Sequence, residues 1–153
     1  MDLDAVVDAL NDLIRAAEDT HLALQRGEED LEDPDLKALC AALADRRGSM
    51  IRDMQERVVA IGGAPDATGT LLGGARRMVA EFGVAIGARG ADDILEGLER
   101  SQQDFLEQLT AARAGDLPDE VGAELDRYAE CVIEDRNRLT RARATGKLAA
   151  GQA

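Results

Sequence analysis

Aromatic side chains are almost missing from this chain, whose 153 residues include one tyrosine, two phenylalanines and no tryptophan. So few rings exclude a large aromatic core and the stacked platform on which single-stranded nucleic acids bind. Proline is also scarce, with three residues, whereas alanine, leucine, glutamate and arginine are abundant. These good helix formers predict an all-α protein. One hydrophobic core suffices at this length, without disulfides or metals.

Basic side chains are too few to balance the acidic ones: 18 Lys and Arg stand against 31 Asp and Glu, a formal net charge of −13. This charge repels phosphate backbones and anionic lipid surfaces, so we expect neither nucleic acid nor a membrane as a partner. No charged start followed by an apolar run marks a signal peptide. No apolar stretch approaches the roughly 20 residues of a membrane helix. We therefore expect a cytoplasmic protein.

Cysteine and histidine, the usual ligands and nucleophiles, are also rare. Cys40 and Cys131 fall in separate helical patterns with no CxxC spacing, so we expect buried free thiols. His21 is the single histidine, and no seryl or cysteinyl partner for it can be identified. The chain also contains neither a nucleophile elbow nor a Walker glycine loop. These enzyme classes are poorly supported.

Apolar residues recur in steps of three and four along four long segments, which predicts four amphipathic helices. We expect them at about residues 2–27, 34–61, 92–114 and 118–145. Together they predict one helical-bundle domain over residues 1–145. The remaining residues, 146–153, are expected to form a flexible C-terminal tail.

Local signals mark where these helices begin and end. Asp33 and Pro34 offer a capping side chain followed by a proline suited to a first helical turn. Gly62 follows the second apolar pattern, where a left-handed cap needs glycine. The acidic run from Gly27 to Asp33 interrupts the first pattern, so we expect the first helix to end there.

The segment Thr68 to Gly90, between the second and third long patterns, is too long for a tight turn and is itself periodic. We expect a fifth, glycine-weakened helix at about residues 70–87. Such a helix carries the chain back along the bundle, so the third long helix runs parallel to the second. The predicted fold is therefore an all-α, ferritin-like four-helix bundle with a long crossover that contains an additional helix.

Five short stretches occur in one order over nearly the whole chain: "LNDLI" (Leu10 to Ile14), "DPDLKAL" (Asp33 to Leu39), "GGAPDATGT" (Gly62 to Thr70), "ILEGLER" (Ile94 to Arg100) and "LPDEV" (Leu117 to Val121). In these stretches the chain resembles bacterial ferritin-like four-helix-bundle proteins classed as a domain of unknown function. The resemblance implies a cytosolic bundle with a crossover helix and no established activity. Family members often carry a histidine where this chain has Glu134, and an acid where it has Gln102.

Glu18 and His21 are the candidate metal ligands, because the Glu-x-x-His spacing presents two ligands on one helix face. A full di-iron site in one bundle needs two such motifs and two further glutamates, which a chain with one histidine does not supply. Acidic residues are also common here, 31 of 153, so a carboxylate near the histidine is a weak signal.

Some polar residues of the four long helices are expected at the same height along the bundle axis, where they form one layer. The members of this predicted polar layer are Glu18, Arg46, Arg47, Glu99, Gln102, Glu134 and Asp135. A guanidinium among carboxylates competes with a metal cation, and buried charges must be paired. We expect Glu18 to pair with Arg46 or Arg47, with Asp135 or Gln102 completing the hydrogen bonds. The layer is then structural, with no metal or other cofactor.

Two functional hypotheses follow. The first is a non-enzymatic cytosolic bundle that acts through protein association, as a homodimer and with an unknown protein partner, because helix faces beyond one seam carry apolar residues. The alternative is a metal-binding or iron-oxidising ferritin-like protein. In that case Glu18 and His21 of two copies complete a site for iron or another divalent metal across a two-fold interface.

Overall fold

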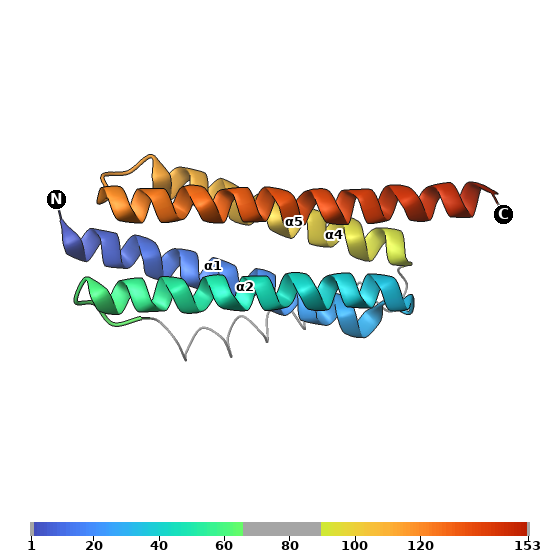
Figure 1. Cartoon of the computed structure of the whole chain (residues 1–153), viewed down its shortest axis with the longest axis horizontal. Helices are drawn as coiled ribbons and strands as arrows, with labels where there is room; N and C mark the ends of the chain where they lie inside the picture. The colour runs from blue at the N-terminus through green and yellow to red at the C-terminus, as the bar shows by residue number, and fades with distance from the viewer. Residues whose placement is uncertain (1, 66–89, 153) are drawn as a thin grey trace.

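Four long helices form one bundle in the computed structural model, which describes residues 2–65 and 90–152 (Figure 1). The helices are α1 (Leu3–Asp30), α2 (Pro34–Ala60), α4 (Ala91–Arg113) and α5 (Asp119–Gln152). The described part of the chain contains no strand, so the predicted all-α four-helix bundle is confirmed. The helix predicted at residues 70–87 lies outside the described residues. No helix in the described ranges is both long and apolar enough to cross a membrane.

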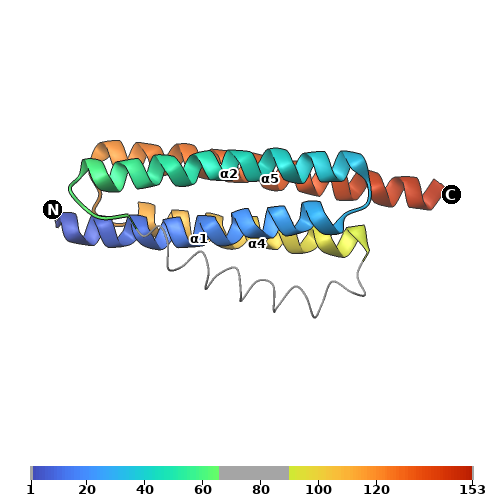
Figure 2. The same ribbon diagram turned by 90° about the horizontal axis from the view of Figure 1, so that it is seen from below.

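The helix directions agree with the predicted crossover. Figures 1 and 2 show α2 and α4 running in one direction, and α1 and α5 in the other. Ion pairs give the same result for α2 and α5, because Arg46 pairs with Glu134 and Arg57 pairs with Glu124, so the two helices are antiparallel. Helix α2 ends at one end of the bundle and α4 begins at the other, which is the arrangement that the predicted crossover requires.

The boundaries of α2 follow the predicted local signals. The side chain of Asp33 accepts hydrogen bonds from the backbone N–H of Asp35, at 2.8 Å, and of Leu36, at 3.4 Å, and Pro34 occupies the first turn. Gly62, just past the helix, has φ of +90°, in the left-handed region that glycine adopts without strain.

Two helices extend past their approximate predicted ends. Helix α1 ends within the acidic run, at Asp30, and Gly27 lies on its buried face. A Cβ at Gly27 would lie 2.9 Å from Leu98 Cδ1, so this glycine permits close packing and does not end the helix. Helix α5 continues to Gln152, where a tail was predicted, and its last turns project beyond the other helices (Figures 1 and 2).

The apolar core consists of two clusters that follow one another along the bundle. On α1 the first cluster ends at Ala17 and the second begins at Ala23. The same interruption occurs on the other helices, between residues 44 and 50 of α2, 98 and 105 of α4, and 132 and 139 of α5. Each interval contains a buried polar residue, so a polar layer crosses the core.

Candidate functional site

The polar layer between the two clusters is built by all four described helices. Its members are at most 5% exposed: Glu18 and Thr20 from α1, Arg47 from α2, Gln102 from α4 and Asp135 from α5. We call this set the Arg47 layer. Arg47 has the largest side chain among the fully buried residues. A charge so enclosed requires partners on every side.

Arg47 supplies the hydrogen bonds that join the helices. Its Nη1 donates to Thr20 Oγ1 at 2.5 Å, and its Nη2 donates to Gln102 Oε1 at 2.5 Å and to Asp135 Oδ2 at 3.2 Å. The guanidinium carbon also lies 4.9 Å from the centre of the Phe105 ring, within the range of a cation–π contact. One side chain of α2 therefore binds to α1, α4 and α5.

The Arg47 layer reaches the surface between α2 and α5, through Arg46. Arg46 Nη1 lies 3.2 Å from Glu134 Oε1, and Arg46 Nε lies 3.5 Å from Asp135 Oδ1. The side chains of Arg46 and Glu134 are 35% and 58% exposed, whereas that of Asp135 is 1% exposed. Asp135 thus connects an exposed ion pair to a buried one.

Burial and charge act in opposite directions on the pKa values of the central pair. Burial lowers the pKa of Arg47, while the Asp135 carboxylate opposes that change. Burial raises the pKa of Asp135, and the guanidinium groups of Arg47 and Arg46 only partly offset it. Glu134 is at the surface, and there the hydrogen bond from Arg46 lowers its pKa. Because a guanidinium releases its proton so reluctantly, Arg47 carries the positive charge of the layer.

The structure shows which acids of α5 pair with the two arginines. Arg47 pairs with Asp135, and Arg46 pairs with Glu134 and Asp135. The expected pairing of Glu18 with an arginine stays a prediction. Glu99, also a predicted member of the layer, pairs with Arg143, whose Nη2 lies 3.0 Å from Glu99 Oε2.

Two residues of the site, Thr20 and Phe105, were not predicted from the sequence. Thr20 is next to His21 in the sequence, and its Oγ1 also donates to the Ala17 carbonyl at 2.8 Å. Phe105 follows Gln102 by one helical turn, a spacing that places both on one face. The sequence signal for Phe105 was this spacing, and for Thr20 it was the position beside the candidate ligand His21.

His21 lies between α1 and α2 and is half-buried. Its Nδ1 is 2.9 Å from the backbone carbonyl oxygen of Ala44. A carbonyl only accepts hydrogen bonds, so Nδ1 carries a proton, and in the neutral ring Nε2 is then the nitrogen with the lone pair. Within the described residues, neither His21 nor Glu18 belongs to a group of three or more potential metal ligands.

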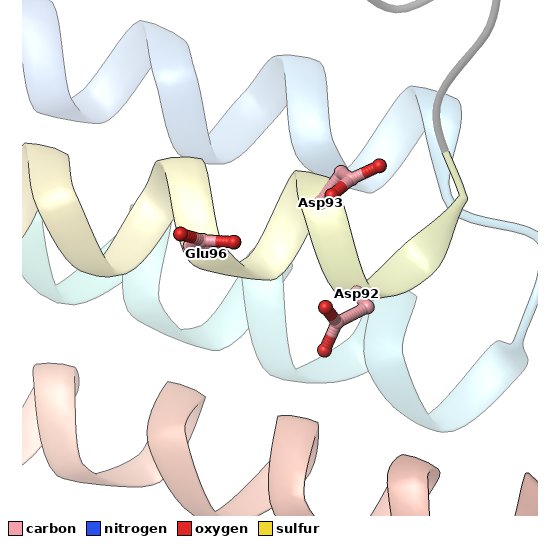
Figure 3. Close-up of side chains that lie close together, drawn as sticks. All are labelled: Asp92, Asp93 and Glu96. Atoms are coloured by element: carbon pink, nitrogen blue, oxygen red, sulfur yellow. The ribbon is translucent and has the colours of Figure 1, made fainter.

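One group of carboxylates does have metal-like spacing: Asp92, Asp93 and Glu96, in the first turns of α4, offer oxygen atoms within 4.8 Å of one another (Figure 3). Arg143 of α5 already binds to it, with Nε 4.0 Å from Asp92 Oδ1 and Nη1 3.6 Å from Glu96 Oε2. Acidic residues also stabilise the start of a helix through its dipole. These ion pairs and the dipole explain the cluster without a metal.

A cleft of about 400 Å³ opens between α2 and α5. Its polar lining consists of Asp53, Glu56, Arg57, Glu124, Arg127 and Tyr128. Arg57 pairs with Glu120, at 3.3 Å, and with Glu124. The Tyr128 hydroxyl donates to Glu124 at 3.3 Å, and burial raises its pKa. Ion pairs and hydrogen bonds therefore account for several of the lining groups.

The two cysteines are both free thiols. Cys40 is fully buried, as predicted, and burial raises its pKa to about 11. Cys131 is half-buried, so the prediction of a buried residue is only partly met there.

Fold and site together define an all-α four-helix bundle with an arginine-centred polar layer. The chain belongs to the family described as Domain of unknown function (DUF2383), whose family model matches residues 5–114. The match covers α2 and α4 and most of α1, but it ends before α5, which contributes Asp135. No curated protein matches the chain. The predicted resemblance to a domain of unknown function is confirmed, and its ferritin-like part stays a prediction.

Proposed function

We propose that this chain is a non-enzymatic cytoplasmic protein that acts through association with other proteins, beginning with a second copy of itself. Its polar layer is structural and contains no metal. The observation that carries this proposal is the position of Arg47, which is 0% exposed and donates hydrogen bonds to α1, α4 and α5.

A guanidinium in this place opposes a bound cation in two ways. It adds a positive charge that repels the metal, and it does not become neutral at physiological pH. It also occupies Gln102 Oε1 and Asp135 Oδ2, oxygen atoms of the kind that coordinate iron or other divalent metals. The charge of Asp135 is therefore balanced without a cofactor.

Surface features support the association part of the proposal. Leu3, Val59 and Ile133 are large apolar side chains that are 48%, 60% and 37% exposed. They lie singly on α1, α2 and α5, and a partner that covered any of them would remove apolar surface from water. The free thiols Cys40 and Cys131 are consistent with a reducing cytoplasm.

The alternative function, a metal site completed across an interface by Glu18 and His21, has one observation in its favour. The Ala44 carbonyl holds the proton on His21 Nδ1, which leaves Nε2 as the available ligand atom. Metal-binding histidines commonly have such a hydrogen bond on the other ring nitrogen. We keep this hypothesis second because the described part of the chain groups no third ligand with His21.

Comparing Arg47→Met with His21→Gln distinguishes the two functions. If the layer is structural, Arg47→Met lowers the free energy of unfolding by about 3 kcal/mol or more, because it leaves buried Asp135 without its closest cation. His21→Gln changes the free energy of unfolding by about 1 kcal/mol or less, since it removes one hydrogen bond. Denaturant titrations with and without a chelator measure both. The reverse order, with a chelator effect that His21→Gln removes, contradicts the proposal.

A further inference from the structure

The Arg47 layer contains polar atoms that the protein does not satisfy. Arg47 Nε, Gln102 Nε2 and Asp135 Oδ1 are buried and have no hydrogen-bond partner in the described part of the chain. Their side chains are 0%, 0% and 1% exposed. Asp135 Oδ1 has an ion-pair contact with Arg46 Nε at 3.5 Å. A buried donor without a hydrogen-bond partner costs about 1–3 kcal/mol, so Arg47 Nε and Gln102 Nε2 require an explanation.

The orientation of Gln102 is fixed by its neighbour. Its Oε1 accepts from Arg47 Nη2 at 2.5 Å. Turning the amide over would place an NH2 group against the guanidinium, donor against donor. The unsatisfied Nε2 is therefore a property of the layer and not an interchange of the amide atoms.

The unsatisfied atoms restrict the chemistry of what binds there. Arg47 Nε and Gln102 Nε2 donate hydrogen bonds, whereas Asp135 Oδ1 accepts them. A metal cation would satisfy only Asp135 and would face the Arg47 guanidinium. An anion would satisfy only the two donors and would face the Asp135 carboxylate. A neutral group that both donates and accepts fits all three, and water is the smallest such molecule.

We propose that the Arg47 layer binds internal water, held by Arg47 Nε, Gln102 Nε2 and Asp135 Oδ1. This inference builds on the metal-free layer proposed above. Because the three side chains are at most 1% exposed, water leaves only when the bundle opens locally, so it stays much longer than surface water. The place where the layer meets solvent is Arg46, which is 35% exposed and contacts Asp135 Oδ1.

Nuclear magnetic resonance of the wild-type protein tests the site directly. We expect the Arg47 Nε–H proton and the Gln102 amide protons to show cross-peaks to the water signal of opposite sign in NOE and ROE spectra. That sign pattern identifies a long-lived neighbouring water and excludes simple proton exchange. Cross-peaks that are missing from both spectra would overturn the inference.

Water oxygen-17 relaxation dispersion provides a second measurement. Gln102→Met keeps the side-chain length but removes the donor, so the dispersion amplitude should fall relative to the wild type. Gln103→Met is the matched control, because Gln103 is the next amide on α4, is half-buried and bonds to Arg136 away from the layer. In this variant the dispersion amplitude should stay at the wild-type value. An amplitude that does not fall in Gln102→Met contradicts the inference, and if that variant does not fold, the wild-type spectra decide.

Metal analysis of the same sample separates the two proposals. Near-stoichiometric metal contradicts the proposed function. A metal-free protein without water contacts at Arg47 contradicts only the water site.

Discussion

Arg46 and Arg47 are neighbours in sequence, but the fold gives their side chains different surroundings. Arg46 is 35% exposed and pairs at the surface with Glu134, whereas Arg47 is 0% exposed and joins three other helices. An exposed ion pair is worth about 0–1 kcal/mol. Breaking a buried one by removing a partner costs about 3–5 kcal/mol. Arg46→Met should therefore be much milder than Arg47→Met.

A double replacement at the centre of the layer tests whether Arg47 and Asp135 stabilise the protein as a pair. Arg47→Met and Asp135→Leu, made singly, should each destabilise the protein because each leaves a buried charge without its partner. Made together they should cost clearly less than the sum, since two apolar side chains then face each other. Urea titrations of the four proteins measure this coupling. Additive effects would show that Arg47 and Asp135 do not act as a pair.

Because the thiol of Cys40 is buried, we expect the protein to lose stability at alkaline pH. Its pKa is raised from 9.0 to about 11 by burial, so the unfolded chain releases the thiol proton first. The contribution of this group is fully present below pH 9.0 and is lost as the pH rises through about 11. The whole effect is at most about 3 kcal/mol. In Cys40→Ala, the free energy of unfolding should fall less steeply across this range than in the wild type. Equal slopes would contradict the assignment.

At the scale of the helices, two glycines offer a matched test of packing. Gly97 of α4 has no atom within 4 Å of where a Cβ would lie, so Gly97→Ala should stabilise the protein by about 0.5–1 kcal/mol through helix propensity. Gly27 of α1 has Leu98 Cδ1 at 2.9 Å, and Leu98 is fully buried. Gly27→Ala should destabilise by about 1–3 kcal/mol through overpacking. Thermal unfolding of both variants measures the difference, and equal effects would contradict the close approach of α1 and α4.

The same glycines show why helix existence was predictable and some helix ends were not. Apolar periodicity and the Asp33 cap depend on nearby residues, so sequence alone located α2 correctly. Inside α1, the close approach of Leu98 from another helix favours a glycine at position 27. From its sequence neighbours alone, Gly27 was interpreted as the start of an interruption, because Leu98 lies far away in the chain.

The candidate site was predicted in position but not in its bonds. Helical heights placed Gln102 and Asp135 in one layer with Arg47, and the structure places them there. Which acid pairs with which arginine depends on side-chain direction, which differs between Arg46 and Arg47 although they are adjacent. Spacing along a helix does not determine that choice.

For the whole molecule, α2 and α4 run in the same direction, as the predicted crossover requires (Figures 1 and 2). The oligomeric state is a separate question, because a bundle with a complete core is stable without a partner. We predict a homodimer, since exposed Leu3, Val59 and Ile133 offer apolar area to a second copy. Light scattering at high protein concentration should give twice the chain mass, and a monomer mass would contradict this prediction.

The central claim is that Arg47, not a metal, balances the buried carboxylate of the polar layer. The metal content of the purified, untagged protein, expressed with added iron, manganese and zinc, tests it most directly. Elemental analysis by mass spectrometry should find far less than one metal ion per chain, with the melting temperature unchanged by a chelator. Near-stoichiometric metal that disappears in His21→Gln would contradict the claim and favour the ferritin-like alternative.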